Sequence, residues 1–238
     1  MKLKLSKGYV IAEIDGKNFV VDTGATISFG YGRNGAVAIN GAEYGLSPIV
    51  PRLKSTLDSI TGVDVAGLIG TDILGKTNLT IDYENGELLF SLKKETAPCI
   101  DFYTIPFSLD CGQCVTDNIM INGINLKNAV IDTGAPISYV SVMVARDLEF
   151  TGKRYYDSSP IFGYINGEYR RGELTFGSMA AFLYRFPVEV GVMPDALDRM
   201  AKFDAVIGPG LLSQKLVEFD FENNFIGVAL DDRSEKKQ

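Results

Sequence analysis

The sequence predicts an all-β fold made of two homologous lobes that are related by a pseudo-two-fold axis. The first observation is a repeat: the stretch KNFVVDTGATIS at 17–28 recurs as KNAVIDTGAPIS at 127–138, with nine of the twelve positions identical. The second is another similar pair, AGLIGTDILGKTNLTIDYENGELLFSL at 66–92 and DAVIGPGLLSQKLVEFDFENNFIGVAL at 204–230. Because both stretches occur twice in the same order, an internal duplication is the simplest interpretation.

The two lobes differ in length. The DTGA stretches lie 110 residues apart and the later stretches 138 residues apart, so the second copy carries 28 more residues between them. We expect an N-terminal lobe at 1–97 and a C-terminal lobe at 98–238, each with one DTGA. A chain of 238 residues is long enough for two small domains with substantial cores.

Turn-forming dipeptides support β structure in both lobes. Short apolar runs are separated by Asp-Gly or Asn-Gly pairs, which favour tight hairpin turns. These pairs are Asp15-Gly16, Asn40-Gly41, Asn85-Gly86, Asn122-Gly123 and Asn166-Gly167. Helices are expected to be short: one is capped by Thr71 and stopped at Gly75, and two begin with a proline, at 51–62 and 194–204.

Charge and hydropathy narrow the range of partners. The chain has 23 basic and 30 acidic side chains, a net charge of −7, which disfavours a nucleic-acid partner because such binding relies on Lys and Arg. It contains no run of about 18 apolar residues, so we expect no membrane span. The N-terminal segment does not resemble a signal peptide, which favours the cytoplasm, with a secreted or periplasmic location open if a leader was removed.

The chain has no histidine. That excludes Ser-His-Asp and Cys-His catalysis within the chain, and every zinc site that needs imidazole. Acid–base chemistry must then use carboxylates, Lys, Tyr or Cys. We expect neither a metal nor another cofactor.

Three cysteines lie near the middle of the chain, Cys99, Cys111 and Cys114. The pair in Cys111-Gly-Gln-Cys114 could be a redox couple or part of a metal site. However, no βαβ pattern surrounds it, and three thiolates without histidine would need a fourth ligand from elsewhere. Structural or incidental thiols are the favoured interpretation.

The aspartate of each DTGA stretch is the main candidate for chemistry. A single Asp after an apolar run can simply end a strand in a turn, but two copies with similar flanks suggest more. Equivalent residues near a pseudo-two-fold axis meet, so Asp22 and Asp132 are expected partners. Two carboxylates about 3 Å apart share one proton. The ionised one can take a proton from water while the protonated one polarises a carbonyl, which permits amide hydrolysis without a metal.

These motifs resemble those of aspartic proteases of the retropepsin and pepsin clan. Each DTGA is followed downstream by an apolar-apolar-Gly element, at 68–70 and 206–208, and the resemblance covers roughly 8–92 and 115–230. The lobe size suggests a single-chain, fused version of the retropepsin dimer. The resemblance implies a β-barrel-like fold in each lobe, a cleft between the lobes, and an aspartic endopeptidase that acts on peptide or protein substrates as a monomer.

The resemblance also assigns roles to residues of the repeated stretch. Asp22 and Asp132 would form the catalytic dyad. The supporting residues would be Thr23 and Thr133 as an interlobe hydroxyl grip, Gly24 and Gly134 as close-approach glycines, and Ala25 and Ala135. Pepsin-like enzymes often have Ser at the alanine position, where its hydroxyl favours the charged carboxylate. With alanine, the dyad should keep its proton to higher pH and act in mildly acidic solution.

Substrate would lie extended beneath hairpins called flaps. In the second lobe we expect a flap at 159–172 that turns at Asn166-Gly167, with Tyr164, Ile165, Asn166 and Gly167 as substrate contacts. In the first lobe, 36–45 fills the matching interval, with Ile39, Asn40 and Gly41. Tyr44 and Tyr169 are further aromatic candidates. The first interval is shorter, 48 residues from Asp22 to Gly70 against 76 from Asp132 to Gly208, which predicts a lopsided cleft. Pro136 replaces Thr26, so the two loops cannot donate identical backbone hydrogen bonds.

The sequence is also compatible with other functions. The main alternative is a catalytically silent peptide-binding or scaffolding protein that retains the aspartic protease fold. A third possibility is thiol redox chemistry at Cys111 and Cys114. The lobes could also pair between chains instead of within one.

Overall fold

The structure is a computed structural model of the 238-residue chain. It describes residues 1–31, 35–48, 51–91, 102–159, 163–178, 181–194, 198–199, 202–209 and 216–229. These residues are mostly β-strand with little helix, which agrees with the all-β prediction. No helix in this part of the chain is both long and apolar enough to cross a bilayer.

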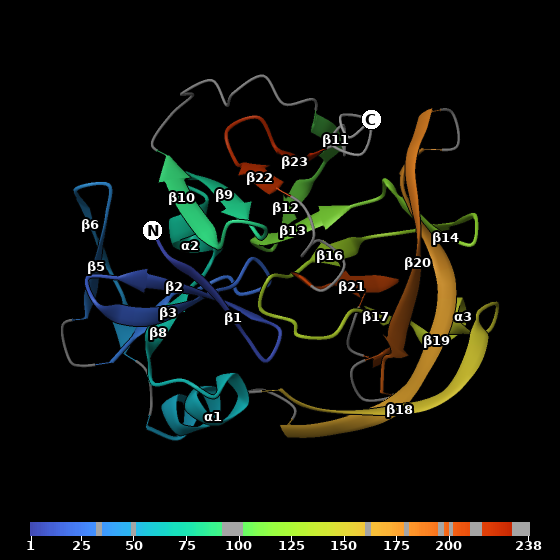
Figure 1. Cartoon of the computed structure of the whole chain (residues 1–238), viewed down its shortest axis with the longest axis horizontal. Helices are drawn as coiled ribbons and strands as arrows, with labels where there is room; N and C mark the ends of the chain where they lie inside the picture. The colour runs from blue at the N-terminus through green and yellow to red at the C-terminus, as the bar shows by residue number, and fades with distance from the viewer. Residues whose placement is uncertain are drawn as a thin grey trace, which may run out of the picture.

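The first half of the chain forms a six-stranded sheet (Figure 1). In spatial order its strands are β1 (Leu3–Ser6), β2 (Tyr9–Ile14), β3 (Lys17–Val21), β8 (Val65–Ile69), β4 (Phe29–Gly30) and β7 (Ser47–Pro48). A separate hairpin, β5 (Ala36–Ile39) and β6 (Ala42–Gly45), buries Val37 and Ile39 in the core. The alternation of buried and exposed residues along β5 is that of a hairpin with one packed face.

The second half forms a ten-stranded sheet. Its main path contains β12 (Ser108–Asp110), β13 (Gln113–Thr116), β16 (Ala129–Ile131), β21 (Ala205–Ile207), β17 (Tyr139–Val140), β20 (Ala181–Val192), β19 (Gly163–Ser178), β14 (Ile119–Ile121) and β15 (Ile124–Leu126). The tenth strand, β18 (Glu149–Ser159), pairs with β19 to make a long hairpin at the right of Figure 1.

The two sheets have the same strand pairings around the repeated aspartates. In the first, β3 runs parallel to β8, which pairs antiparallel with β4. In the second, β16 runs parallel to β21, which pairs antiparallel with β17. Each DTGA therefore begins at the end of a central, buried strand.

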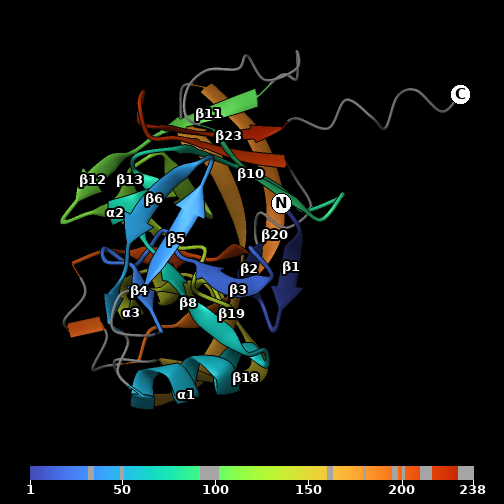
Figure 2. The ribbon, with the colours of Figure 1, turned by 90° about the vertical axis from the view of Figure 1, so that its left-hand side faces the viewer.

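A third sheet joins the two halves. Its order is β10 (Glu87–Ser91), β9 (Asn78–Asp82), β22 (Leu216–Asp220), β23 (Phe225–Ala229) and β11 (Phe102–Pro106). Because β9 pairs with β22, this sheet continues from one half into the other, and it lies in the upper part of both Figure 1 and Figure 2. One cluster of buried hydrophobic side chains likewise contains residues from both halves. The proposed boundary at 97/98 lies outside the described residues and stays a prediction.

Among the described residues, the strands at the two ends of each of these three sheets do not pair with each other, so none of the sheets closes into a barrel. The barrel shape expected for each lobe stays a prediction.

Three predicted turns are two-residue hairpins with positive φ at both positions, Asp15-Gly16, Asn40-Gly41 and Asn122-Gly123. The Asn85-Gly86 hairpin has a longer loop, in which the Asp82 carboxylate accepts hydrogen bonds from the Asn85 backbone and side chain.

The predicted turn at Asn166-Gly167 is wrong. Both residues lie within β19, where Gly167 pairs with Tyr155 and Asn166 with Tyr156. A side chain at Gly167 would overlap the Tyr155 ring, with a Cβ 2.6–2.7 Å from three of its atoms. The glycine is thus required by the close approach of a ring and not by a turn.

The helices are short, as expected. α1 is Pro51–Thr61 and α2 is Thr71–Leu74, with Gly75 following α2 as predicted. However, Gly70 occupies the N-cap position of α2 in place of Thr71. A third helix, α3 (Val142–Ala145), was not predicted and is capped by the Ser141 hydroxyl. Within the predicted helix at 194–204, residues 198–199 are helical, whereas 195–197 and 200–201 lie outside the described residues.

Candidate active site

Asp22 and Asp132 occupy equivalent positions in the two halves. The Asp22 N–H donates to the Ile69 carbonyl at 3.0 Å, and the Asp132 N–H donates to the Ile207 carbonyl at 2.9 Å. Each of these bonds extends the parallel pairing of a central strand by one residue. The repeated sequence of apolar strand, aspartate and downstream apolar-Gly element is therefore what aligns the two acids.

Two serines in the repeated stretch hold the downstream glycines. The Ser28 hydroxyl accepts a hydrogen bond from the Gly70 N–H at 2.9 Å, and Ser138 accepts one from Gly208 at the same distance. Sequence reasoning assigned these serines no role, although both lie within the twelve-residue repeat. Their repetition was the signal that could have identified them.

The threonines of the two DTGA loops are joined by reciprocal hydrogen bonds. Thr23 N–H donates to Thr133 Oγ1, and Thr133 N–H donates to Thr23 Oγ1, each at 3.0 Å. Each hydroxyl in turn donates to a strand carbonyl of the other half at 2.7 Å, Thr23 to Ile131 and Thr133 to Val21. Both threonines are buried. These four bonds fix the two loops against each other.

The glycines let each carboxyl group reach the opposite loop. A Cβ at Gly24 would overlap the Asp132 carboxyl group, and one at Gly134 would overlap that of Asp22. The two carboxyl groups are hydrogen-bonded to each other, with Asp132 as the donor that its higher pKa favours. Both aspartates are partly exposed, so water can reach a pair that is otherwise enclosed by protein.

The carboxyl pair is electrostatically unequal. Burial raises the pKa of Asp132 well above its usual range, and the charge and hydrogen bond of Asp22 raise it further. Burial also raises the pKa of Asp22, but the hydrogen bond from Asp132 and the N–H groups of Gly24 and Ala25 oppose that rise. The pair therefore holds one shared proton, which these interactions favour on Asp132.

The backbone bonds of the loops contribute to this difference. Gly24 and Ala25 both donate to Asp22 Oδ1, at 2.9 and 2.8 Å. In the other loop, Gly134 donates to Asp132 Oδ1 at 2.8 Å, whereas Ala135 N–H turns to the main-chain oxygen of Asp132 at 3.2 Å. The two loops thus donate different backbone hydrogen bonds: two reach the Asp22 carboxylate and one reaches that of Asp132.

A hairpin turn from each half lies against the DTGA loop of the other. Gly112, in the β12–β13 turn, lies beside Thr26, and Gln113 donates from Nε2 to the Gly24 carbonyl at 3.0 Å. In the β1–β2 turn, Gly8 lies beside Pro136. Tyr9, which follows Gly8, is buried, and its pKa is raised by burial and then by the charges of Asp157, Asp132 and Asp22. Sequence reasoning missed both Gln113 and Tyr9.

The hairpin predicted as the first-lobe flap packs against the core. Ile39 is fully buried in the core, and Asn40 at the hairpin tip donates from Nδ2 to the Phe90 carbonyl at 2.5 Å, so the hairpin with Gly41 packs toward β10. Tyr44 also packs against this core and lies under the Lys76 ammonium. The predicted substrate role of 36–45 is therefore not supported by its position.

Helix α1 covers the wall beside the first DTGA instead. Leu53, Leu57 and Ile60 pack with Ala25, Phe29 and Leu68. In the second half, the equivalent residues Ala135, Tyr139 and Val206 pack with Tyr155 and Ile165 of the β18–β19 hairpin. One half thus has a helix where the other has a hairpin, and both lie on the lower side of the molecule in Figure 1.

The β18–β19 hairpin contains most of the segment 159–172 that was predicted as the second-lobe flap, and its strands join before Asn166. Ile165 is buried in the wall cluster beside Ala135, and Tyr169 packs on Tyr155 with ring centroids 5.5 Å apart. Asn166 and Gly167 lie within the strand. Tyr164 lies in β19, but its side chain is outside the described residues, as is the segment 160–162 that joins the strands.

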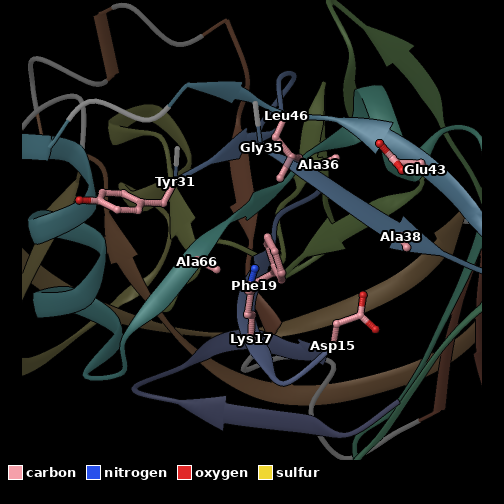
Figure 3. A pocket seen from close by; sticks show the side chains of 10 residues that line it. All are labelled: Asp15, Lys17, Phe19, Tyr31, Gly35, Ala36, Ala38, Glu43, Leu46 and Ala66. Atoms are coloured by element: carbon pink, nitrogen blue, oxygen red, sulfur yellow. The ribbon is translucent and has the colours of Figure 1, made fainter. Parts of the chain in front are cut away.

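A cavity of about 420 Å³ lies away from the aspartates (Figure 3). It is lined by residues of β3, β8 and the β5–β6 hairpin, among them Phe19 and Ala66, and by Leu46, Asp15 and Lys17. None of its lining residues comes from a DTGA loop or from the second half. It is therefore separate from the dyad.

The described cysteines are both free thiols. Cys111 is exposed and lies with positive φ in the β12–β13 turn, whereas Cys114 is fully buried in β13. Burial and then the charge of Asp132 raise the pKa of Cys114 to about 12, which makes it a poor nucleophile. Among the described residues, no group of three or more His, Cys, Asp or Glu side chains could hold a metal ion. Cys99 lies outside the described residues.

Comparison with known proteins identifies the fold. No model of a known protein family matches the sequence, and no curated protein matches it. Among solved structures, the basic 7S globulin from soybean is similar, with a TM-score of 0.55 at 11% sequence identity, over 96% of this chain and 94% of that one. That protein has a bilobal pepsin-like fold. The chain has a pepsin-like fold.

Proposed function

We propose that the protein is an aspartic endopeptidase in which Asp22 and Asp132 activate water to hydrolyse peptide bonds. The observation that supports this most strongly is the pair of facing carboxyl groups, held by reciprocal threonine hydrogen bonds and unequal in pKa. A pair of titratable groups whose environments separate their pKa values is typical of an acid and a base that work together.

The geometry suggests how the two acids divide the work. Ionised Asp22 takes a proton from a water molecule held between the carboxyl groups, and protonated Asp132 donates a hydrogen bond to the substrate carbonyl oxygen. Water then attacks the carbonyl carbon without a covalent intermediate. Asp22, now protonated, passes its proton to the leaving nitrogen as the C–N bond breaks.

The substrate is an extended peptide or protein segment. The apolar walls beside the dyad favour apolar side chains near the scissile bond. Both carboxyl groups come from one chain, so the enzyme acts as a monomer whose specific activity is independent of protein concentration. A single-chain, duplicated retropepsin-like origin and a cytoplasmic location belong to the same proposal.

The second candidate is a non-catalytic peptide-binding or scaffolding protein of the same fold. The similarity to the soybean basic 7S globulin is compatible with it. Helix α1 in place of a first flap favours this candidate, because among the described residues the β18–β19 hairpin alone remains to enclose a substrate.

Binding of a transition-state mimic separates the two candidates. A catalytic site should bind a pepstatin-type inhibitor at least about 10²-fold more tightly than a substrate-like peptide of the same sequence. Mass-spectrometric cleavage profiles on a diverse peptide library would be recorded in parallel. Equal affinities together with an uncleaved library would leave the binding protein as the function.

The dyad predicts a bell-shaped dependence of kcat/KM on pH. The acid limb reports protonation of Asp22, and the alkaline limb reports loss of the proton from Asp132. Because burial and the charge of Asp22 raise the pKa of Asp132 well above its usual range, the alkaline limb should lie above the ordinary carboxyl range near pH 4. We expect a mildly acidic optimum, and a rate that still rises below about pH 3 would contradict this assignment.

A further inference from the structure

Two side chains of β18 connect the β18–β19 hairpin to the strands that surround the second DTGA. The first is Tyr155, which is buried and donates from its hydroxyl to the Val192 carbonyl at 2.5 Å. Its ring meets that of Tyr139 edge-on, with centroids 5.4 Å apart. Gly167 and Gly191 flank the Tyr155 ring, where any Cβ would overlap it. This packing holds one point of the hairpin.

The second side chain is Asp157. It lies two residues beyond Tyr155 along β18 and so points to the same face of the strand. Its carboxylate accepts a hydrogen bond from the Tyr139 hydroxyl. Burial, and then this hydrogen bond, raise the pKa of Tyr139 far above its ordinary value, so the hydroxyl stays protonated and donates throughout the working pH range.

Tyr139 belongs to the group of paired strands that positions Asp132. It is the first residue of β17, where it pairs with Val206 of β21 and with Gly191 of β20. The preceding residue, Ser138, holds the Gly208 N–H. A hydrogen bond from Tyr139 to Asp157 of β18 therefore connects the strands that position Asp132 to the hairpin.

We propose that the Tyr139–Asp157 hydrogen bond is a latch that sets the height of the β18–β19 hairpin over the dyad. The role of the latch in substrate binding rests on the proposed function. In the first half, α1 packs as a helix on the equivalent wall, so this hairpin is the described element best placed to pair with an extended substrate. The two residues are positioning residues and do not take part in the chemistry.

The latch predicts an effect on KM with little change in kcat. Tyr139→Phe keeps the ring packing and removes only the hydroxyl, and Asp157→Ala removes the acceptor. Each should raise KM about tenfold or more, the scale of a hydrogen bond to a charged group, with kcat within about twofold. Asp157→Asn retains an acceptor oxygen and should be intermediate. The double variant Tyr139→Phe/Asp157→Ala should be no worse than either single change.

Hydrogen exchange tests the latch independently of activity. Amides of residues 149–159 should exchange faster in Tyr139→Phe than in the parent, while those of β8 should not change. Tyr83→Phe is the matched control, because the Tyr83 hydroxyl is buried without a hydrogen-bond partner among the described residues. It should alter neither KM nor exchange in β18.

Three outcomes would overturn the latch: unchanged exchange in β18, additive effects in the double variant, or a fall in kcat at constant KM. A parent protein that cleaves no peptide would refute the proposed function and with it the role of the latch in substrate binding. The exchange comparison would still decide whether the hydrogen bond holds the hairpin, so the two failures are distinguishable.

Discussion

Asp22→Asn and Asp132→Asn should each abolish peptide cleavage while leaving the protein folded. Asn at position 22 cannot take a proton from water, and Asn at position 132 has no carboxylic acid proton with which to polarise the substrate carbonyl. General acid–base groups of this kind contribute about 10²–10⁴-fold each, so single-variant rates should fall by at least that factor. Rates would be measured on the best peptide from the library, with circular dichroism to verify the fold.

The two variants should differ in stability. Because the pKa of Asp132 is raised in the folded state, its contribution to stability is greatest below the ordinary carboxyl pKa and is lost as pH rises through the folded-state value. Asp132→Asn should therefore have a higher Tm than the parent at neutral pH, and the difference should shrink in acid. In a chain of this size, each kcal/mol corresponds to about 2–4 °C.

Asp15→Asn is the matched control for these substitutions. Asp15 lies in the β2–β3 turn with positive φ, a conformation that Asn adopts equally well. The control should retain parental activity and Tm. If Asp22→Asn and Asp132→Asn cleave as well as Asp15→Asn does, the dyad assignment fails.

Thr23→Val should cause the largest loss of stability of any change proposed for this protein. Valine has the shape of threonine but leaves the Thr133 N–H and the Ile131 carbonyl buried without their present partner. Each unsatisfied group costs about 1–3 kcal/mol, or about 2–6 kcal/mol together, from a total of about 5–15 kcal/mol. Urea unfolding would measure the loss, and activity should fall with it because the two loops are no longer fixed.

Thr23→Ser separates the hydroxyl from the methyl group. Serine keeps both hydrogen bonds and removes one buried methyl, which costs about 1 kcal/mol. By the pseudo-two-fold relation of the bonds, Thr133→Val and Thr133→Ser should behave like their Thr23 counterparts. Equal free energies of unfolding for the Val and Ser variants would mean that the threonine hydrogen bonds do not hold the loops together.

The carboxyl pair and its threonine bonds could be predicted from sequence because the same short stretch occurs in both halves. Asp22, Thr23 and Gly24 need only end a buried strand in each half for their counterparts to meet at an axis. The hairpins at Asp15-Gly16, Asn40-Gly41 and Asn122-Gly123 were predictable for a similar reason, since positive φ is a preference of the residues themselves.

Tertiary structure alone decided what covers the site. Asn166-Gly167 has the residues of a turn, yet Gly167 lies in a strand because the Tyr155 ring needs its space. The apolar wall beside Ala25 received α1, and the one beside Ala135 received a hairpin. These choices depend on side chains that meet only after folding, such as Leu57 with Leu68. Local backbone preferences act within a few residues, whereas packing depends on contacts between side chains that are far apart in the sequence.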